Sequence, residues 1–360
     1  MKRAIFATAV LVAALAVAPA AEAKAKRPPK LTVMTQNLYL GSGLIAAATA
    51  PDRPTFEQRA ATVWQNVQAT DFPARAKRLA RLINGANPDL IGLQEVTRWY
   101  RSPNGVKDGN ATRSNILVYD FLKSLLRELG KAGARYKAVA TDGLPTDIEA
   151  PTALGYDIRF ALGNVILAKR ERGLKIRRKS FGQYKAQFTI NTPGGPFAAH
   201  RAWVAVDATF KGKRFRFVDT HLESEVPPTR LQEAVELASK AGPLRVKGQK
   251  ILVGDLNSDP KGRRPNDGPE SYKAVTRTGF QDAWPKAGRG LGLTSDALNN
   301  ELLRAPIPLR YRERIDYAFA KPHLPVLKAG LLGLKPGDRT PSGLWPSDHA
   351  GLAVTYRLGR

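Results

Sequence analysis

Several apolar segments of the sequence run directly into a carboxylate, an amide or an imidazole side chain. The residues concerned are Asn37, Glu95, His221, Asp255, Asn257, Asp316, Asp348 and His349. A carboxylate is costly to bury unless it meets a metal ion, a proton or a partner group. Oxygen ligands of this kind suit hard divalent cations, and histidine exchanges protons near neutral pH. The set therefore predicts one site that binds a cation and transfers protons.

The spacing within the set supports convergence. Residues two apart in an extended segment point to the same side, so Asp255 and Asn257 are expected to reach the same pocket. Taken singly, an aspartate after a strand is most often a turn or helix-cap residue. It is the repetition of the pattern along the chain that favours a functional site.

The elements that position these residues follow from the hydrophobic pattern. Buried strands are predicted at Leu31–Gln36, Leu90–Leu93, Asn164–Ala168, Trp203–Phe210, Phe215–Asp219, Ile251–Val253, Ile315–Phe319 and Gly351–Leu358. Helices are predicted at Arg75–Gly85, Asn115–Leu129 and Arg230–Ala241. Strands mixed with helices indicate a layered α/β domain.

Polar or Gly/Pro-rich stretches separate the predicted elements. They lie at 40–56, 101–114, 141–152, 189–200, 259–270 and 285–310. None of them divides two self-sufficient cores, so we expect a single domain over residues 24–360. Long loops in compact enzymes commonly shape the substrate site, which makes 40–56 and 285–310 of particular interest.

The N-terminus has the pattern of a secretory signal peptide. Lys2 and Arg3 precede an apolar run over residues 4–18, and Ala21-Glu-Ala23 forms a small-residue cleavage site. The alternative, a membrane anchor, needs about 20 apolar residues. We therefore expect residues 1–23 to be removed, leaving a secreted, monomeric protein with no stable membrane anchor.

Composition excludes some chemistry and favours certain partners. The chain has no cysteine, so disulfides, cysteine catalysis and zinc–thiolate sites are excluded. Its 57 Lys and Arg against 31 Asp and Glu give a net charge of +26. A positive field attracts polyanions such as nucleic acid, although an arginine-rich composition also occurs without such a partner.

Some residues outside the motifs have two possible readings. Arg310, Arg312 and Arg314 form either a basic stripe toward a polyanion or a solvated strand face. Trp99 and Tyr100 either stack on a ligand or pack within a loop.

Six motifs in the chain resemble, in order, those of the endonuclease/exonuclease/phosphatase superfamily, which includes deoxyribonuclease I-like and sphingomyelinase-like proteins. They are Thr35-Gln-Asn-Leu38, Gly92-Leu-Gln-Glu-Val96, Asp219-Thr-His-Leu222, Gly254-Asp-Leu-Asn257, Arg314-Ile-Asp-Tyr317 and Ser347-Asp-His349. The resemblance covers almost the whole chain after residue 23. It implies an α/β fold, a four-layer sandwich of two packed, mainly antiparallel β-sheets flanked by helices. It also implies cleavage of a phosphoester by an activated water.

The resemblance further implies roles for the metal ligands and the groups around the water. Glu95 is the principal metal carboxylate, with Asn37 beside it and Asp348 as a ligand or orienting group. Mg²⁺ is the expected ion, and Mn²⁺ and Ca²⁺ share its oxygen ligands. Asp255 orients or deprotonates the attacking water, and Asn257 holds the phosphate through its amide.

The histidines complete the implied site. Asp316 is the acidic partner of His349, and a neighbouring carboxylate raises the pKa of an imidazole. His349 then acts as general base or stabilises charge in the transition state. His221 contacts a phosphate oxygen or acts as general acid. His323 is expected in a surface turn, and His200 is expected to pack rather than to line the cleft.

Several functions share these motifs, because the motifs contact only the phosphate and the metal. We expect a secreted metal-dependent phosphodiesterase, with nucleic acid favoured over phospholipid because of the net charge. A sphingomyelinase-type phospholipase C and an inositol-type phosphatase are the alternatives within the family. A catalytically inactive binding protein is the alternative of another class, and the completeness of the motifs argues against it.

Overall fold

The computed structural model describes residues 1, 28–107, 114–171, 173–263, 267–295, 301–307 and 309–359. Apart from Met1, the predicted signal peptide over 1–23 lies outside the described residues, and that prediction therefore remains untested. Within the described ranges, no helix combines the length and the apolar composition that crossing a membrane requires.

The first sheet has eight strands in the order β15–β16–β1–β2–β6–β4, with β3 beside β2 and β5 beside β6. Only β1 and β2 pair in parallel within it. The strands are β1 (Lys30–Asn37), β2 (Leu90–Arg101), β3 (Ile116–Asp120), β4 (Tyr136–Thr141), β5 (Thr146–Pro151), β6 (Asp157–Lys169), β15 (Val326–Leu332) and β16 (Gly351–Arg357).

The second sheet has six strands in the order β13–β14–β12–β11–β10–β7, and its one parallel pair is β11 with β12. A separate hairpin, β8 with β9, belongs to neither large sheet. The strands are β7 (Leu174–Gln183), β8 (Phe188–Thr192), β9 (Gly195–Ala199), β10 (Ala202–Phe210), β11 (Lys213–His221), β12 (Gln249–Asp255), β13 (Gln281–Asp282) and β14 (Asp316–Lys321).

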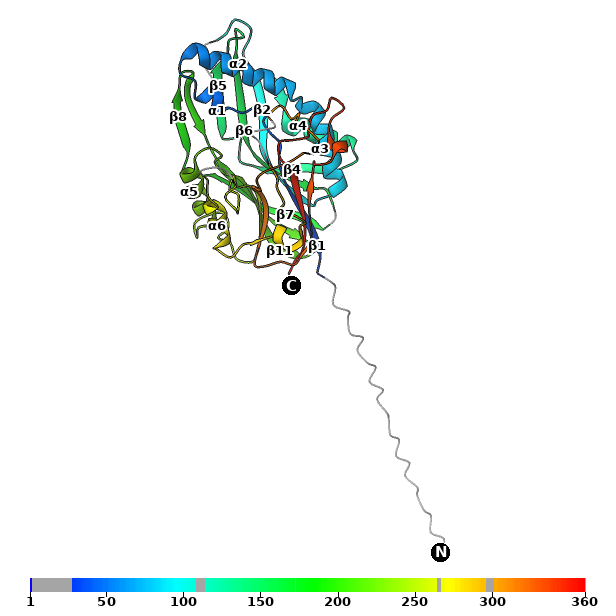
Figure 1. The fold of residues 1–360 in the computed structure, drawn as a ribbon. Coiled ribbons are helices and arrows are strands. Elements are labelled where there is room, and N and C mark those ends of the chain that lie inside the picture. Colours follow the sequence, from blue (N-terminus) through cyan, green and yellow to red (C-terminus); the bar gives the residue numbers. More distant parts are fainter. Residues whose placement is uncertain are drawn as a thin grey trace.

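Helices cover the outer faces of the two sheets. Figure 1 shows α2, α3 and α4 on the side of the first sheet, and α5 and α6 on the opposite side of the molecule. The helices are α1 (Ile45–Ala48), α2 (Arg53–Ala69), α3 (Phe72–Ala86), α4 (Phe121–Lys131), α5 (Pro227–Ala238), α6 (Glu270–Thr276) and α7 (Trp284–Ala287), with a 3-10 turn, η2, at Pro336–Asp338.

Three apolar clusters hold these layers together. The central cluster lies between the sheets, where Val33 and Val354 of the first meet Val206, Phe217 and Ile251 of the second. A further cluster lies between α2–α4 and the first sheet, and a third between α5–α6 and the second. The expected four-layer sandwich of two mainly antiparallel sheets flanked by helices is therefore confirmed.

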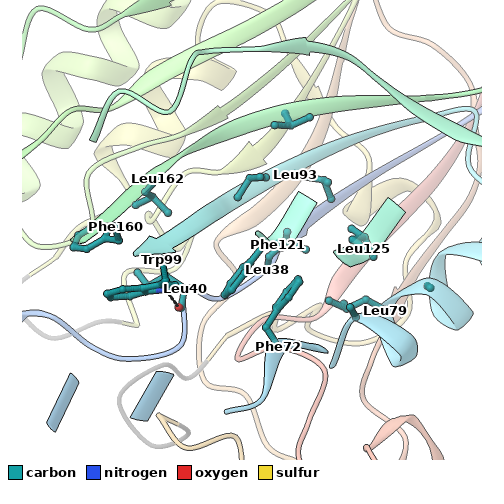
Figure 2. Close-up of a cluster of buried hydrophobic side chains, with 14 of the residues drawn as sticks. Leu38, Leu40, Phe72, Leu79, Leu93, Trp99, Phe121, Leu125, Phe160 and Leu162 are labelled. Atoms are coloured by element: carbon teal, nitrogen blue, oxygen red, sulfur yellow. Dashed lines mark hydrogen bonds between the residues drawn. The ribbon is translucent and has the colours of Figure 1, made fainter. Parts of the chain in front are cut away.

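The core beneath α3 and α4 fixes the position of Trp99. Phe72 and Phe121 stack with ring centroids 3.6 Å apart, and Figure 2 shows Trp99 beside Phe160 in the same apolar layer. Trp99 is fully buried, and its indole N–H donates to the Leu40 carbonyl at 2.9 Å. It belongs to β2, so both readings of Trp99, ligand stacking and loop packing, were wrong.

Local structure departs from the sequence prediction in a few places. The predicted helix over Asn115–Leu129 is wrong at its start, because Ile116–Asp120 forms strand β3 along β2. The helix begins only after Asp120, whose carboxylate caps it by accepting from the Lys123 N–H at 2.8 Å. The predicted loops 141–152 and 189–200 contain β5 and the β8–β9 hairpin.

Candidate active site

The two parallel strand pairs bring the predicted site residues to one end of the sandwich. Asn37 ends β1 and lies opposite Gln94 of β2, next to Glu95. His221 and Asp255 end β11 and β12 opposite each other, and Asp316 pairs with Asp255 from β14. Parallel neighbours end at the same edge of a sheet, so strands far apart in sequence deliver their polar ends together.

These ends open into a pocket of about 450 Å³. Six of the eight predicted residues line it: Glu95, His221, Asp255, Asn257, Asp348 and His349. The other two, Asn37 and Asp316, are buried directly behind them. The structure therefore places all eight predicted residues in one site, which contains side chains from both sheets.

Glu95 enters the site from an interruption in β2. The pairing of β2 with β6 shifts register between Leu93 and Val96, and Glu95 has a left-handed backbone with φ of 53°. Such a conformation is uncommon outside glycine. Its carboxylate accepts from the Leu40 N–H at 2.6 Å and from the Asn37 amide at 3.1 Å. The bulge thus redirects one carboxylate out of the strand and into the pocket.

Asn37 joins the two carboxylates at the pocket floor. Its Nδ2 donates to Glu95 Oε1 at 3.1 Å and to Asp255 Oδ2 at 3.2 Å. Its Oδ1 accepts from the Tyr39 N–H at 2.8 Å. An amide can satisfy both acids without adding charge, so Asn37 holds them close together.

Asp255 and Asn257 share a tight turn after β12. Asn257 has φ of 48°, and its backbone N–H donates to Asp255 Oδ1 at 2.9 Å. Its amide donates to the Leu222 carbonyl at 2.9 Å and lies 3.1 Å from His221 Nε2. Burial, followed by the charge of Asp316, raises the pKa of Asp255 to about 6.

His349 is held by carboxylates on the pocket floor. Its Nδ1 lies 2.8 Å from Asp316 Oδ2, and its Nε2 lies 3.7 Å from Asp255 Oδ2. Burial alone would lower the pKa of His349, but Asp316, Asp348 and Asp255 together raise it well above the usual value. The imidazole is therefore positively charged at neutral pH.

His221 lies in the opposite electrostatic environment. Burial lowers the pKa of His221 well below its usual value, and the Arg201 cation and His349 add to the effect. Arg201 Nη1 lies 3.2 Å from the His221 ring. The two histidines of the pocket therefore differ in charge at neutral pH, with His349 charged and His221 neutral. Pairs of groups whose pKa values are pushed apart are typical of acid–base sites.

The comparisons with known proteins place this geometry in a family. The family described as Endonuclease/Exonuclease/phosphatase has a model that matches residues 34–349, a range that contains all eight predicted residues. The chain belongs to this family. Members of the endonuclease/exonuclease/phosphatase family are hydrolases that act on phosphoesters and generally use a divalent metal.

Solved structures of the same family have the same fold. An endonuclease/exonuclease/phosphatase family protein from Bacteroides thetaiotaomicron has a TM-score of 0.59 and 18% identity, over 93% of this chain and 100% of that one. The mannosyl-6-phosphatase Bt3783 of the same organism has a TM-score of 0.54 and 19% identity, over 90% and 98%. A family protein from Beutenbergia cavernae has a TM-score of 0.54 and 20% identity, over 93% and 72%. No curated protein sequence is a significant match.

The donor set fits the divalent cation that the family uses. Glu95 and Asp348 supply carboxylate oxygens, as hard divalent ions require. Burial raises the pKa of Asp348 to about 7; the charge of Glu95 acts in the same direction, against that of His349. A cation beside these acids would remove the repulsion between them. A second group of possible ligand atoms, from Asp255, Asp316 and His349, lies within 4.8 Å of one another.

A buried polar layer beneath the site supports the motif strands of the family. Gln94 Nε2 donates to Asp219 Oδ1 at 2.6 Å across the two sheets. Gly92 allows this approach, because a Cβ there would lie 2.5 Å from Asp219 Oδ1 and 2.6 Å from Val253 Cγ2. The glycine and glutamine of the Gly92–Val96 motif thus position the strand that carries Glu95.

Two arginines contribute to the site although no motif indicated them. Arg201 contacts His221, as described above, and forms an ion pair with Glu223 at 3.3 Å. Arg75 of α3 is fully buried and donates to the carbonyls of Leu38 at 2.7 Å and Pro346 at 3.1 Å. It therefore joins the loop after β1 to the segment before Asp348. The only sequence signal for Arg75 was a cation among the apolar positions of a helix.

Other sequence predictions have mixed outcomes. Arg314 is buried and pairs with Asp282 at 2.7 Å, so it joins neither a basic stripe nor a solvated face, while Arg310 and Arg312 are exposed. His323 lies exposed after β14, as predicted. His200 is half-buried against Gln187 and lines a small side cavity of the site that also contacts Glu95 and His221.

Proposed function

We propose that the protein is a secreted, Mg²⁺-dependent phosphodiesterase in which Asp255 activates water and His349 stabilises the phosphate. The arrangement of one charged imidazole, held by Asp316, 3.7 Å from the Asp255 carboxylate carries the proposal. The signal-peptide pattern over residues 1–23 supports export.

Different residues of the pocket have different roles in the proposed hydrolysis. Asp255 is oriented by the Asn257 N–H and the Asn37 amide, and as a carboxylate it holds and deprotonates the attacking water. His349, kept protonated by Asp316, donates from Nε2 to a phosphate oxygen. His221 and the Arg201 guanidinium line the same pocket and contact the other phosphate oxygens.

Glu95, Asp348 and Asn37 form the part of the site that would hold the cation. When bound, the ion neutralises charge on the phosphate and on the departing oxygen. Leu40 N–H and Asn37 Nδ2 fix Glu95 in place for this role. The preference for Mg²⁺ over Mn²⁺ or Ca²⁺ rests on the small number of carboxylates, since Mg²⁺ typically keeps several of its waters.

Nucleic acid is one candidate substrate of such a phosphodiesterase, and the net charge of +26 favours it. Lys and Arg side chains bind the backbone phosphates of nucleic acid, and added salt would weaken that binding steeply. A sphingomyelinase-type or phosphomonoesterase activity uses the same floor residues with a different group beyond the phosphate.

The test is hydrolysis by the purified mature protein, with Mg²⁺ and with EDTA. Bis(4-nitrophenyl) phosphate, plasmid DNA and sphingomyelin vesicles are compared side by side. We expect Mg²⁺-dependent release of nitrophenol that EDTA abolishes and that His349→Ala reduces at least a hundredfold. Hydrolysis unchanged by EDTA or by His349→Ala would contradict the proposal. Mass spectrometry of the exported protein should find an N-terminus near Lys24.

A further inference from the structure

One wall of the catalytic pocket is apolar and aromatic. Phe188 and Phe197 face each other across the β8–β9 hairpin, with ring centroids 6.2 Å apart in an edge-to-face arrangement. Both line the pocket, together with Phe160 and Leu162 of β6. The polar residues Glu95, His221 and His349 line the same pocket. The pocket therefore combines reactive polar groups with an apolar, aromatic part.

The hairpin is anchored beside the reactive centre. Its preceding segment is held by Tyr184, whose N–H donates to the Arg201 carbonyl at 3.0 Å. Its last strand runs into His200, whose N–H and carbonyl both bond to the Thr146 hydroxyl. Because Arg201 contacts His221 directly, the position of the aromatic wall is fixed relative to the catalytic residues.

A second, apolar crevice of about 50 Å³ lies under the hairpin tip. The pocket and the crevice share Leu44, Ala48, Phe160 and Phe197. At the tip, Gly194 lies against the Phe56 ring of α2, where a Cβ would have no room. The crevice is therefore bounded by packed elements and shares part of its apolar lining with the catalytic pocket.

The charge of the pocket differs from that of the whole protein. Among its described lining residues, seven are acidic and one is Lys or Arg. The acids are Glu95, Glu223, Glu225, Asp255, Asp267, Glu313 and Asp348, and the arginine is Arg201; the charged imidazole of His349 also lines the pocket. Arg201 already pairs with Glu223, and Glu225 is exposed at the rim. A ligand with several phosphates would need further cations along its path. Among the described lining residues the cations are Arg201 and the His349 imidazole, and each already faces a carboxylate.

We propose that the pocket selects a small phosphoester with one phosphate and an apolar alkyl group, and that Phe160, Phe188 and Phe197 bind that group. The inference rests on the proposed function and specifies its substrate class. Apolar burial supplies the affinity for the alkyl group, while the acidic lining of the pocket disfavours a second phosphate.

The experiment measures binding, so that it does not depend on turnover. Isothermal titration calorimetry with Mg²⁺ compares methyl phosphate, hexyl phosphate and hexane-1,6-diyl bisphosphate. We expect hexyl phosphate to bind at least about tenfold more tightly than methyl phosphate, since burial of the additional methylene groups is favourable. The bisphosphate should bind more weakly than hexyl phosphate.

Variants assign the effect to the aromatic wall. Phe188→Ala and Phe197→Ala should each reduce the hexyl-to-methyl affinity ratio toward one. Phe181→Ala is the matched control, because Phe181 is exposed on β7 and does not line this pocket. It should preserve the wild-type ratio.

Three outcomes would overturn the inference: equal affinities for methyl and hexyl phosphate, tighter binding of the bisphosphate, or an unchanged ratio in both phenylalanine variants. A failure of the proposed catalytic function would give a different experimental result from a failure of this inference. Selective binding of hexyl phosphate without hydrolysis of any phosphodiester would support the subsite and reject the catalytic proposal.

Discussion

His349 Nδ1 lies 2.8 Å from Asp316 Oδ2, although the two residues come from different sheets. Asp316 begins β14 of the second sheet, and His349 precedes β16 of the first. The remaining Asp316 oxygen, Oδ1, is buried and has no hydrogen-bond partner among the described residues. The pair therefore depends on the packing of the two sheets, and it sets the charge of the imidazole.

Asp316→Asn should remove the main group that keeps His349 protonated. A folded-state pKa raised above the usual value means that the charged form persists to alkaline pH. We expect the alkaline limb of the kcat/KM profile to move to lower pH, with a loss of about 10²-fold or more at pH 8. Asp207→Asn, in an ion pair with Arg216 at 2.8 Å on the strands β10 and β11, is the control. An alkaline limb that stays in place would disprove the assignment.

The acid limb should report Asp255, whose pKa is raised to about 6 by burial and by Asp316. Asp255 must be ionised to accept a proton, so activity is expected to rise as the pH increases through about 6. Bound metal favours the carboxylate and should move this midpoint lower. Measuring kcat/KM from pH 4 to pH 7 at two Mg²⁺ concentrations tests both statements. An acid limb that moves upward with added Mg²⁺ would argue against Asp255.

Glu95→Gln should abolish the response of the protein to divalent metal. A ligand that binds only the folded state raises its stability by RT ln(1 + [L]/Kd), so Mg²⁺ should raise the Tm of the wild type but not of the variant. Glu270→Gln, at an exposed position on α6, should respond as the wild type does. A full Mg²⁺ shift in Glu95→Gln would exclude Glu95 as the principal ligand.

Glu233 should make the protein less stable as the pH rises. Its side chain is buried in α5, with Oε2 accepting from the Glu223 N–H at 2.7 Å and Oε1 without a hydrogen-bond partner among the described residues. Burial raises its pKa from 4.5 to about 8. The folded state therefore holds the proton more tightly, and stability falls as the pH rises from about 4.5 to about 8.

Glu233→Gln isolates that contribution, because glutamine can keep the acceptor for the Glu223 N–H but does not ionise. We expect the Tm of the variant relative to wild type to increase between pH 5 and pH 9. The free-energy change is on the order of a few kcal/mol. A difference that is constant across this pH range would show that Glu233 ionises normally.

Gly92→Ala should damage both stability and activity. The added Cβ would lie 2.5 Å from Asp219 Oδ1, and overpacking of this kind costs about 1–3 kcal/mol. The strand would have to move, and with it Glu95. Chemical denaturation and kcat measure the two effects. Gly85→Ala, at a position in α3 with open space around it, should leave kcat unchanged, and an equally active Gly92→Ala protein would rule out the close approach.

The sequence predicted the site better than its surroundings. Asn37, Glu95 and Asp255 could be predicted because each follows an apolar strand within a short motif, and such a motif is visible in the local sequence. Arg201 could not be predicted in this way, because its contact with His221 depends on the pairing of β10 with β11. The aromatic wall was hidden for a similar reason, since a polar, glycine-containing stretch resembles a loop whether or not it forms a hairpin.

Helices and strands were missed where tertiary packing overrides the local pattern. Ile116, Leu117 and Val118 read as the start of an apolar helix, yet they are exposed on β3. Arg314 read as a surface cation because it alternates with Arg310 and Arg312, but Asp282, from a distant strand, neutralises it in the interior. Such pairings join residues that are remote in sequence, so no local spacing indicates them.

Asp348 and His349 lie immediately before β16, and this position determines when the site is completed during folding. Strand β16 pairs with β1, the first strand of the fold, so Asp348 and His349 reach the pocket only when these two strands, remote in sequence, have paired. A partly folded chain in which β16 has not yet paired with β1 has Glu95 and Asp255 but no positioned His349. Such a chain lacks the catalytic imidazole, so hydrolytic activity during refolding should appear only together with the pairing of these two strands.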